Sequence, residues 1–180
     1  MSTFDKAHKF TAKWEGGYGE NQNDPGGATK YGISLRFLKQ QDFDIGDIDG
    51  DGDVDADDVR ALTPDDAARL MKREFWDGLG LNEVKERCAM VLYDTAVNMG
   101  PSFARRMAQR ALGVRADGAW GPVTRGALRE CDDKKTAIAM CHIRRARYHE
   151  LVKKNSKLSE FLKGWLRRVD SLEGEIERAR

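Results

Sequence analysis

Three residues near the start of the chain, Glu15, Asp24 and Thr29, supply a carboxylic acid, a second carboxylate and a hydroxyl group. Glu15 follows Trp14 at the end of a helical pattern and precedes two glycines, so its carboxyl group can stand at the edge of a cleft. Glycoside cleavage needs one acid to protonate the leaving oxygen and a carboxylate to activate water or stabilise an oxocarbenium ion. The three residues therefore favour glycosidase chemistry.

A second set of carboxylates lies in the segment 47–58, which reads DIDGDGDVDADD. It has aspartate at loop positions 1, 3, 5, 9 and 12, Gly52 at position 6 and Val54 at position 8, which is the EF-hand calcium loop pattern. The five carboxylates at these positions would repel one another unless a hard cation lay among them. The expected calcium ligands are Asp47, Asp49, Asp51, Asp55 and Asp58, with the backbone carbonyl of Asp53.

The last position of this loop departs from the usual pattern, because Asp58 stands where glutamate is common. The shorter side chain reaches a cation less easily, so affinity is reduced or the loop tightens. The segment also resembles one loop of a dockerin module, in which aspartate is ordinary at this position. We expect a calcium ion that stabilises the loop. A regulatory calcium switch and a solvated loop without metal are the alternatives.

The elements that must position these groups are mostly helices. Apolar residues recur at helical spacing over 3–15, and Thr63-Pro64-Asp65-Asp66 has the residues of a helix start. A helix is also expected after Ser34, and further helical patterns fill the chain from Val84 to its end. Residues 16–33 are rich in glycine and predict turns and a short hairpin. The pattern predicts a mainly α protein with one small β element.

Composition and charge limit the class of protein. The 180 residues carry a net charge of +1, but the segment 42–66 holds eleven aspartates and one arginine, so it carries −10 and the remainder +11. A basic body suits a polyanionic partner such as cell wall, lipid or nucleic acid. No apolar run is long enough to cross a bilayer, and the first ten residues have no signal-peptide core. The three cysteines, Cys88, Cys131 and Cys141, are expected to be buried, reduced thiols.

The text around Glu15, KWEGGYGENQNDPGGATKYGIS, resembles the catalytic segment of glycoside hydrolase family 108, the lysozymes of many phage and prophage endolysins. The resemblance continues through REFW, YDTAVNMG and ALGVRADGAWGPVT. It implies that Glu15 is the general acid and that Asp24 and Thr29 match the triad of phage-type lysozymes. The implied activity is an N-acetylmuramidase that cuts the β-1,4 bond between N-acetylmuramic acid and N-acetylglucosamine.

The role of Asp24, as base or as electrostatic partner, stays open in this comparison. Two carboxyl groups roughly 6.5–9.5 Å apart would favour inversion of configuration, whereas about 5 Å would favour retention.

The resemblance also implies a fold and its organisation. We expect a mainly α, lysozyme-like, two-lobed fold with a small β-hairpin, formed by 1–180 as one domain. Residues 1–90 would form the catalytic lobe, with the EF-hand insertion at about 42–62. Residues 91–180 would form a helical lobe that resembles a peptidoglycan-binding module. Its motif at 117–124, DGAWGPVT, is similar to that of such modules, but it is equally explained as a turn that joins two helices.

Four further residues are candidates for sugar binding, because aromatic rings stack on sugars and an amide can bind N-acetyl groups: Tyr18, Tyr31, Tyr93 and Asn98. Each is equally explained by packing. Tyr93 and Asn98 are five residues apart on one helical pattern and share a face only if the helix ends near Asn98, which Gly100-Pro101 favours.

Two other functions fit parts of the sequence. A lytic transglycosylase uses one glutamate and leaves an anhydro sugar, but Asp24 and Thr29 argue against it. A non-catalytic, calcium-dependent wall-binding module is the second alternative, and the intact context of Glu15 argues against it. We expect peptidoglycan as the partner, no nucleic acid, no stable membrane insertion and a monomer. As an endolysin, the protein would be stored in the host cytoplasm and would act at the cell wall after release.

Overall fold

The computed structural model describes residues 1–15 and 28–179, which form two compact units. The first, which we call the helical unit, consists of Met1–Phe10 and Glu74–Arg180. The second, which we call the hairpin unit, consists of Thr11–Arg73. The chain passes between them within helix α1 (Thr3–Ala12) and within a π-helical stretch, η1 (Lys72–Asp77). Tyr18 and Asp24 lie outside the described residues.

The hairpin unit contains one two-stranded sheet and several short helices. Its elements are β1 (Thr29–Lys30), β2 (Ile33–Ser34), α2 (Leu35–Leu38), α3 (Phe43–Gly46), α4 (Ala56–Ala61) and α5 (Pro64–Met71). The strands are antiparallel, and Lys30 pairs with Ile33. The two residues between them, Tyr31 and Gly32, have φ angles of 52° and 80°, as a type I′ turn requires. The small β element expected from the sequence is confirmed.

Side-chain caps fix where two of these helices begin. The Ser34 hydroxyl accepts a hydrogen bond from the Phe37 amide at 3.2 Å and so starts α2 directly after the hairpin. Thr63 and Asp66 form a reciprocal capping box at the start of α5, with Pro64 in its first turn. The helix start that the sequence predicts at Thr63-Pro64 is therefore confirmed.

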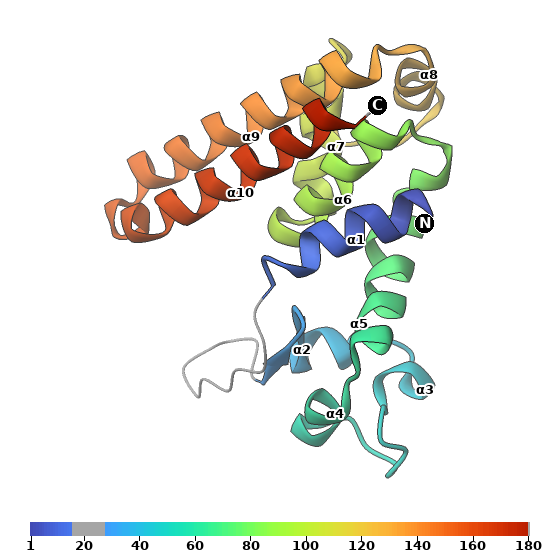
Figure 1. The fold of residues 1–180 in the computed structure, drawn as a ribbon. Coiled ribbons are helices and arrows are strands. Elements are labelled where there is room, and N and C mark those ends of the chain that lie inside the picture. Colours follow the sequence, from blue (N-terminus) through green and yellow to red (C-terminus); the bar gives the residue numbers. More distant parts are fainter. Residues whose placement is uncertain (16–27, 180) are drawn as a thin grey trace. The chain divides into compact units, whose positions relative to one another are not determined.

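Longer helices make up the helical unit. After α1 and η1 they are η2 (Leu81–Glu83), α6 (Glu86–Met99), α7 (Pro101–Ala111), α8 (Pro122–Glu130), α9 (Asp133–Lys154), η3 (Ser156–Leu158) and α10 (Ser159–Arg178). Figure 1 shows α9 and α10 running side by side, and α6 contacts both α7 and α9. Helix α6 is the core of this unit, because every side chain from Cys88 to Ala96 is buried.

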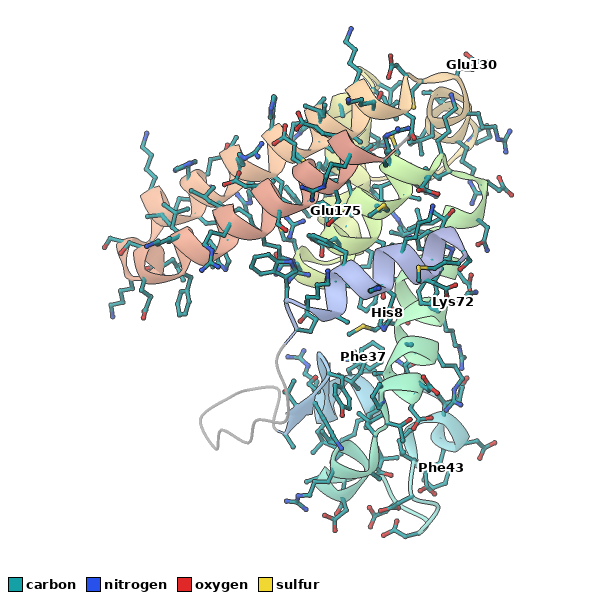
Figure 2. The ribbon with its side chains drawn as sticks, in the orientation of Figure 1. His8, Phe37, Phe43, Lys72, Glu130 and Glu175 are labelled. Carbon is teal, nitrogen blue, oxygen red and sulfur yellow. The ribbon has the colours of Figure 1, made fainter. Side chains whose placement is uncertain are left out.

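Aromatic rings fill one part of this core. Phe4 and Trp76 each pack edge-on against Tyr93, with ring centroids 5.7 and 5.8 Å apart. His8, labelled in Figure 2, places its Nδ1 atom 2.9 Å from the Tyr93 hydroxyl. Burial lowers the pKa of His8, although Asp5 acts in the opposite direction.

A buried ion cluster ties α6 to α9 and α10. The Asp94 carboxylate accepts hydrogen bonds from Arg144 at 2.5 Å and from Arg168 at 2.7 Å. The Asp94 and Arg144 side chains are fully buried. Removing one partner of such a pair strongly destabilises the fold, because the other charge is left buried and uncompensated.

Two details differ from the sequence-based expectations. The first helix ends at Ala12 rather than at residue 15, and the Trp14 amide donates to the Thr11 carbonyl in a closing turn. All three cysteines are free, but only Cys88 and Cys141 are buried, whereas Cys131 is half-buried. Burial raises the pKa of Cys141 to about 12, so this thiol stays protonated.

Candidate functional site

The bend after α1 carries Glu15, and the hairpin turn lies directly against it. A Cβ atom added to Gly32 would stand 3.1 Å from Glu15 Cγ, 3.2 Å from Glu15 Oε2 and 2.7 Å from Met71 Cε. A larger residue at position 32 would crowd the Glu15 side chain, and Gly32 also has the positive φ that glycine tolerates best. The half-buried Glu15 carboxyl group therefore rests on the backbone of the turn.

The same hairpin carries two more predicted site residues. Thr29 lies in β1, where it pairs with Ser34, and it is half-buried. Tyr31 occupies the turn next to Gly32, and the Lys30 ammonium lies 5.5 Å from its ring centroid. The structure thus brings Glu15 next to the turn that includes Tyr31, and β1 and the turn fix Thr29 two residues before it. The second carboxylate, Asp24, is outside the described residues, as is Tyr18.

The other two predicted sugar-binding residues lie in the helical unit and differ sharply in exposure. Tyr93 is 0% exposed within the aromatic core described above, so its ring offers no face for a sugar. This position corrects the expectation that Tyr93 lines a cleft, because the residue packs on the inner side of α6. Asn98 lies one turn further, beside the end of α6 at Met99, and is exposed.

The predicted calcium loop lies between α3 and α4 in the hairpin unit. One carboxylate oxygen from each of Asp47, Asp49 and Asp58 lies within 4.8 Å of the other two, and the same holds for Asp53, Asp55 and Asp58. Asp58 belongs to both groups and is only 1% exposed. Carboxylate oxygens at this spacing are the ligands that calcium prefers. These carboxylates therefore fit a calcium ion.

Backbone amides hold the carboxylates of this loop in place. The amides of Gly50 and Gly52 donate to Asp47, at 2.8 and 3.2 Å. The amides of Ile48 and Asp55 donate to the two oxygens of Asp58, at 2.6 and 2.7 Å. Gly52 has a φ of 99°, which accounts for glycine at the sharp turn of the loop.

Carboxylate crowding is visible in the electrostatics of the loop. Desolvation, followed by the charges of the neighbouring aspartates, raises the pKa of the exposed Asp49, and the Asp51 carboxylate is the main cause that raises the pKa of Asp53. In the part of the chain that the structure describes, no lysine or arginine forms an ion pair with the six candidate ligands. A cation among them would relieve this repulsion.

The motif at 117–124 forms a turn that is organised by Gln109 of α7. The Gln109 side-chain amide donates to Asp117 Oδ1 at 2.9 Å, to the Ala119 carbonyl at 2.8 Å and to Thr124 Oγ1 at 3.1 Å. Its carbonyl oxygen accepts from the Gly118 amide at 2.7 Å. The polar groups that mark the motif in sequence bond to one another, and they join α7 to α8.

Sequence reasoning missed the residues that hold the site groups in place. Gly32 was not singled out, although a tyrosine-glycine pair between two short strands is compatible with a two-residue turn. Gln109 and Arg144 were missed because nothing near them in sequence marks them. The partners of Gln109 lie 8 to 15 residues away, and Arg144 bonds to Asp94, 50 residues away, as well as to nearby Tyr148.

Comparisons with known proteins show to which class of protein the chain belongs. A family model described as "Glycosyl hydrolase 108" matches residues 8–100, which include Glu15, the hairpin and the acidic loop. A second model, described as "Predicted Peptidoglycan domain", matches residues 103–170. The chain belongs to glycosyl hydrolase family 108. It is a glycosidase with a cell-wall lytic function, and its partner is peptidoglycan.

The fold is shared with a solved structure titled "Structure of Brucella abortus SagA". That chain is 30% identical, with a TM-score of 0.76, and the match covers 97% of this chain and 93% of the other. The mainly α, lysozyme-like fold expected from the sequence is thereby confirmed. No curated protein matches the chain. Among the described helices, none combines the length and apolar character that a bilayer crossing demands.

Proposed function

We propose that this glycosidase is an N-acetylmuramidase, in which Glu15 protonates the bridging oxygen of the β-1,4 bond between N-acetylmuramic acid and N-acetylglucosamine. The observation that carries the proposal is the contact between Glu15 and Gly32. It places the half-buried Glu15 against a two-residue turn, within the region that matches the glycosidase family. A general acid needs a fixed position relative to the leaving oxygen, and the turn provides it.

The remaining steps are assigned to the other two residues of the predicted triad. In the proposed reaction Glu15 delivers its proton to the leaving oxygen as the glycosidic bond breaks. Asp24 then stabilises the oxocarbenium ion or removes a proton from the attacking water. Thr29, on β1, helps to orient that water. The water supplies its hydroxyl group to the anomeric carbon, so the product has an ordinary reducing end.

The test is the identity of the new chain end. Purified peptidoglycan digested in ¹⁸O-labelled water should yield reducing N-acetylmuramic acid that contains the label, as read by mass spectrometry. Glu15→Gln should lower the rate of release by at least a thousandfold, while the melting temperature stays within about 2 °C of the parent. An unlabelled anhydro sugar would instead identify a lytic transglycosylase. If Glu15→Gln releases sugar at the rate of the parent, Glu15 is not the general acid.

We further propose that the loop at 47–58 binds one calcium ion, through the carboxylates of Asp47, Asp49, Asp51, Asp55 and Asp58 and the carbonyl of Asp53. The proposal is supported by the two overlapping carboxylate groups and by the absence of an ion pair with these six residues among the described residues. The ion would stabilise the folded hairpin unit, because it binds the assembled loop and not the unfolded chain. No catalytic step is assigned to it.

The route to the wall is also a proposal. We propose that the protein acts as an endolysin, which accumulates in the cytoplasm and reaches peptidoglycan when a separate pore forms. The sequence motifs shared with phage and prophage lysozymes support it. Bacteria that express the protein should keep growing until the inner membrane is permeabilised, and should then lyse within minutes. Lysis without permeabilisation would contradict this route.

A further inference from the structure

A pocket of about 280 Å³ opens in the helical unit, where the two family-matched regions meet. The end of α6 and the start of α7 form one side, and α9 and α10 form the other. Its walls combine apolar side chains with an amide, a guanidinium group and a tyrosine hydroxyl. The lining residues are Asn98, Met99, Phe103, Arg147, Tyr148, Leu151 and Trp165.

The orientation of the Asn98 amide in this pocket follows from its partners. Its Oδ1 atom accepts hydrogen bonds from the Tyr148 hydroxyl at 2.6 Å and from Arg144 Nη2 at 3.2 Å. A guanidinium group can only donate, so the oxygen of the amide must face Arg144. The group that Asn98 can offer a ligand is therefore its NH₂. Among the described residues, no acceptor occupies that NH₂.

The two partners of Asn98, Arg144 and Tyr148, are held in place by further hydrogen bonds. Arg144 Nε donates to the Tyr148 hydroxyl at 3.0 Å, which leaves the Tyr148 proton for Asn98. Arg144 is held by the buried Asp94 carboxylate at 2.5 Å. This chain of contacts runs from the core of the helical unit to the pocket wall, and it keeps Asn98 a donor whatever the ligand.

The other residues that line the pocket determine which chemical groups it can bind. Arg147, which pairs with Glu150 at 3.3 Å, is a second donor. Met99, Phe103, Leu151 and the Trp165 ring supply apolar surface. Trp165 is fixed by stacking on Tyr148, with ring centroids 5.0 Å apart. A ligand that suits these walls has a carbonyl oxygen to accept from the donors and a small apolar group beside it, as an acetamido group has.

We propose that this pocket binds the acetamido group of an N-acetylated amino sugar of the glycan strand, with Asn98 Nδ2 donating to the acetamido oxygen and the methyl group on the apolar wall. The inference deepens the proposed function, on which it rests for the class of substrate. It assigns part of glycan recognition to the junction of the two matched regions, and it makes Asn98 a binding residue whose orientation depends on Arg144 and Tyr148.

Binding can be measured without cleavage in the Glu15→Gln protein. Chitotetraose, a β-1,4 tetramer of N-acetylglucosamine, should shift the indole NMR signal of Trp165, which is assigned by its loss in Trp165→Phe. Cellotetraose has the same linkage without acetamido groups, and it should bind at least tenfold more weakly. This comparison requires no change in the pocket itself.

The matched variant is Asn98→Asp, which keeps oxygen acceptors for Arg144 and Tyr148 but replaces the donor with an acceptor. It should weaken chitotetraose binding at least tenfold, whereas His149→Gln, at an exposed position of α9 that does not line the pocket, should not. Equal binding of the two sugars, an unperturbed Trp165 signal or full affinity in Asn98→Asp would each overturn the inference. Failure of the proposed function appears separately, as undiminished cleavage by Glu15→Gln.

Discussion

Glu15 and Gly32 are in such close contact that a Cβ atom added at position 32 would stand 3.1 Å from Glu15 Cγ, so the Glu15 side chain would have to move aside by a few tenths of an ångström. Residues 17 positions apart are brought together because α1 ends at Ala12 and the hairpin turns back at Tyr31 and Gly32. The contact links the shape of the turn to the position of the proposed acid. Any change that moves the turn should therefore move the carboxyl group.

The first prediction concerns Gly32→Ala. A left-handed backbone costs alanine about 1–2 kcal/mol, and the new Cβ would also stand 2.7 Å from Met71 Cε. We expect the free energy of unfolding to fall by about 2 kcal/mol or more. Peptidoglycan release should fall about a hundredfold, because a misplacement of about 1 Å in a catalytic group has an effect of this size. Urea denaturation and a turbidity assay on cell walls measure the two effects.

A glycine elsewhere provides the control for this variant. Gly126 lies in α8, and a Cβ there would meet no described atom within 4 Å. Gly126→Ala should raise stability by up to about 1 kcal/mol and leave activity unchanged. If Gly32→Ala kept full activity, the contact would not position the acid.

The second prediction concerns calcium. A ligand present at a hundred times its Kd stabilises the folded state by about 2.7 kcal/mol. For a chain of this size, that corresponds to a rise in melting temperature of about 5–10 °C. Chelation should reverse the rise, and Asp47→Asn should abolish most of it. Differential scanning calorimetry with and without calcium measures both.

Asp57→Asn is the matched control, because Asp57 lies in the same segment but pairs with Arg60 rather than with the candidate ligands. Its response to calcium should match that of the parent. If calcium does not change the melting temperature of the parent, and elemental analysis detects no metal, the loop does not bind calcium.

Much of the fold could be predicted from local patterns. The capping residues Thr63 and Asp66 and the periodic apolar residues of α6 identified helices, because both signals act over a few residues. The end of α1 was placed three residues late, because Trp14 continues the apolar spacing although it lies in a turn. The register of the two-residue strands was beyond reach, since it depends on Tyr31 adopting a positive φ that is uncommon for tyrosine.

The candidate site could be proposed from the sequence where motifs carry the chemistry, but not where packing decides which side chains are accessible. Glu15 and the acidic loop stand out as residue types at fixed spacing. Tyr93 and Asn98 look alike in sequence as polar positions of one helix, but one is buried among aromatic rings and the other lines a pocket. Only partners distant in sequence, such as Phe4 for Tyr93 and Tyr148 for Asn98, separate them.

The third prediction concerns Gln109, whose side chain is 1% exposed and makes four hydrogen bonds to the 117–124 turn. Gln109→Leu leaves several of these polar groups without partners and should lower the free energy of unfolding by about 2–4 kcal/mol. Binding of the folded variant to cell walls should stay within twofold of the parent. Loss of wall binding without loss of stability would show that the motif contacts peptidoglycan directly.

The last prediction concerns acid stability and Asp94. Burial alone would raise the pKa of this carboxyl, but the Arg144 and Arg168 guanidinium groups outweigh it, so the pKa is lowered in the folded protein. Because the unfolded chain takes up this proton at a higher pH, about 3.9, the contribution of Asp94 is complete at neutral pH. It is lost as the pH falls below about 5 toward the pKa of the folded protein. Asp94→Asn should therefore lower the free energy of unfolding by about 3–5 kcal/mol at pH 7, and it should flatten the acid dependence seen in urea denaturation between pH 7 and pH 3.

The control is Asp170→Asn, which alters the pair between Asp170 and Arg145 at the surface. It should lower the free energy of unfolding by no more than about 1 kcal/mol and keep the pH slope of the parent. An unchanged slope in Asp94→Asn would mean that other carboxylates set the acid limit, and that the Asp94 cluster is not the main electrostatic tie between α6, α9 and α10.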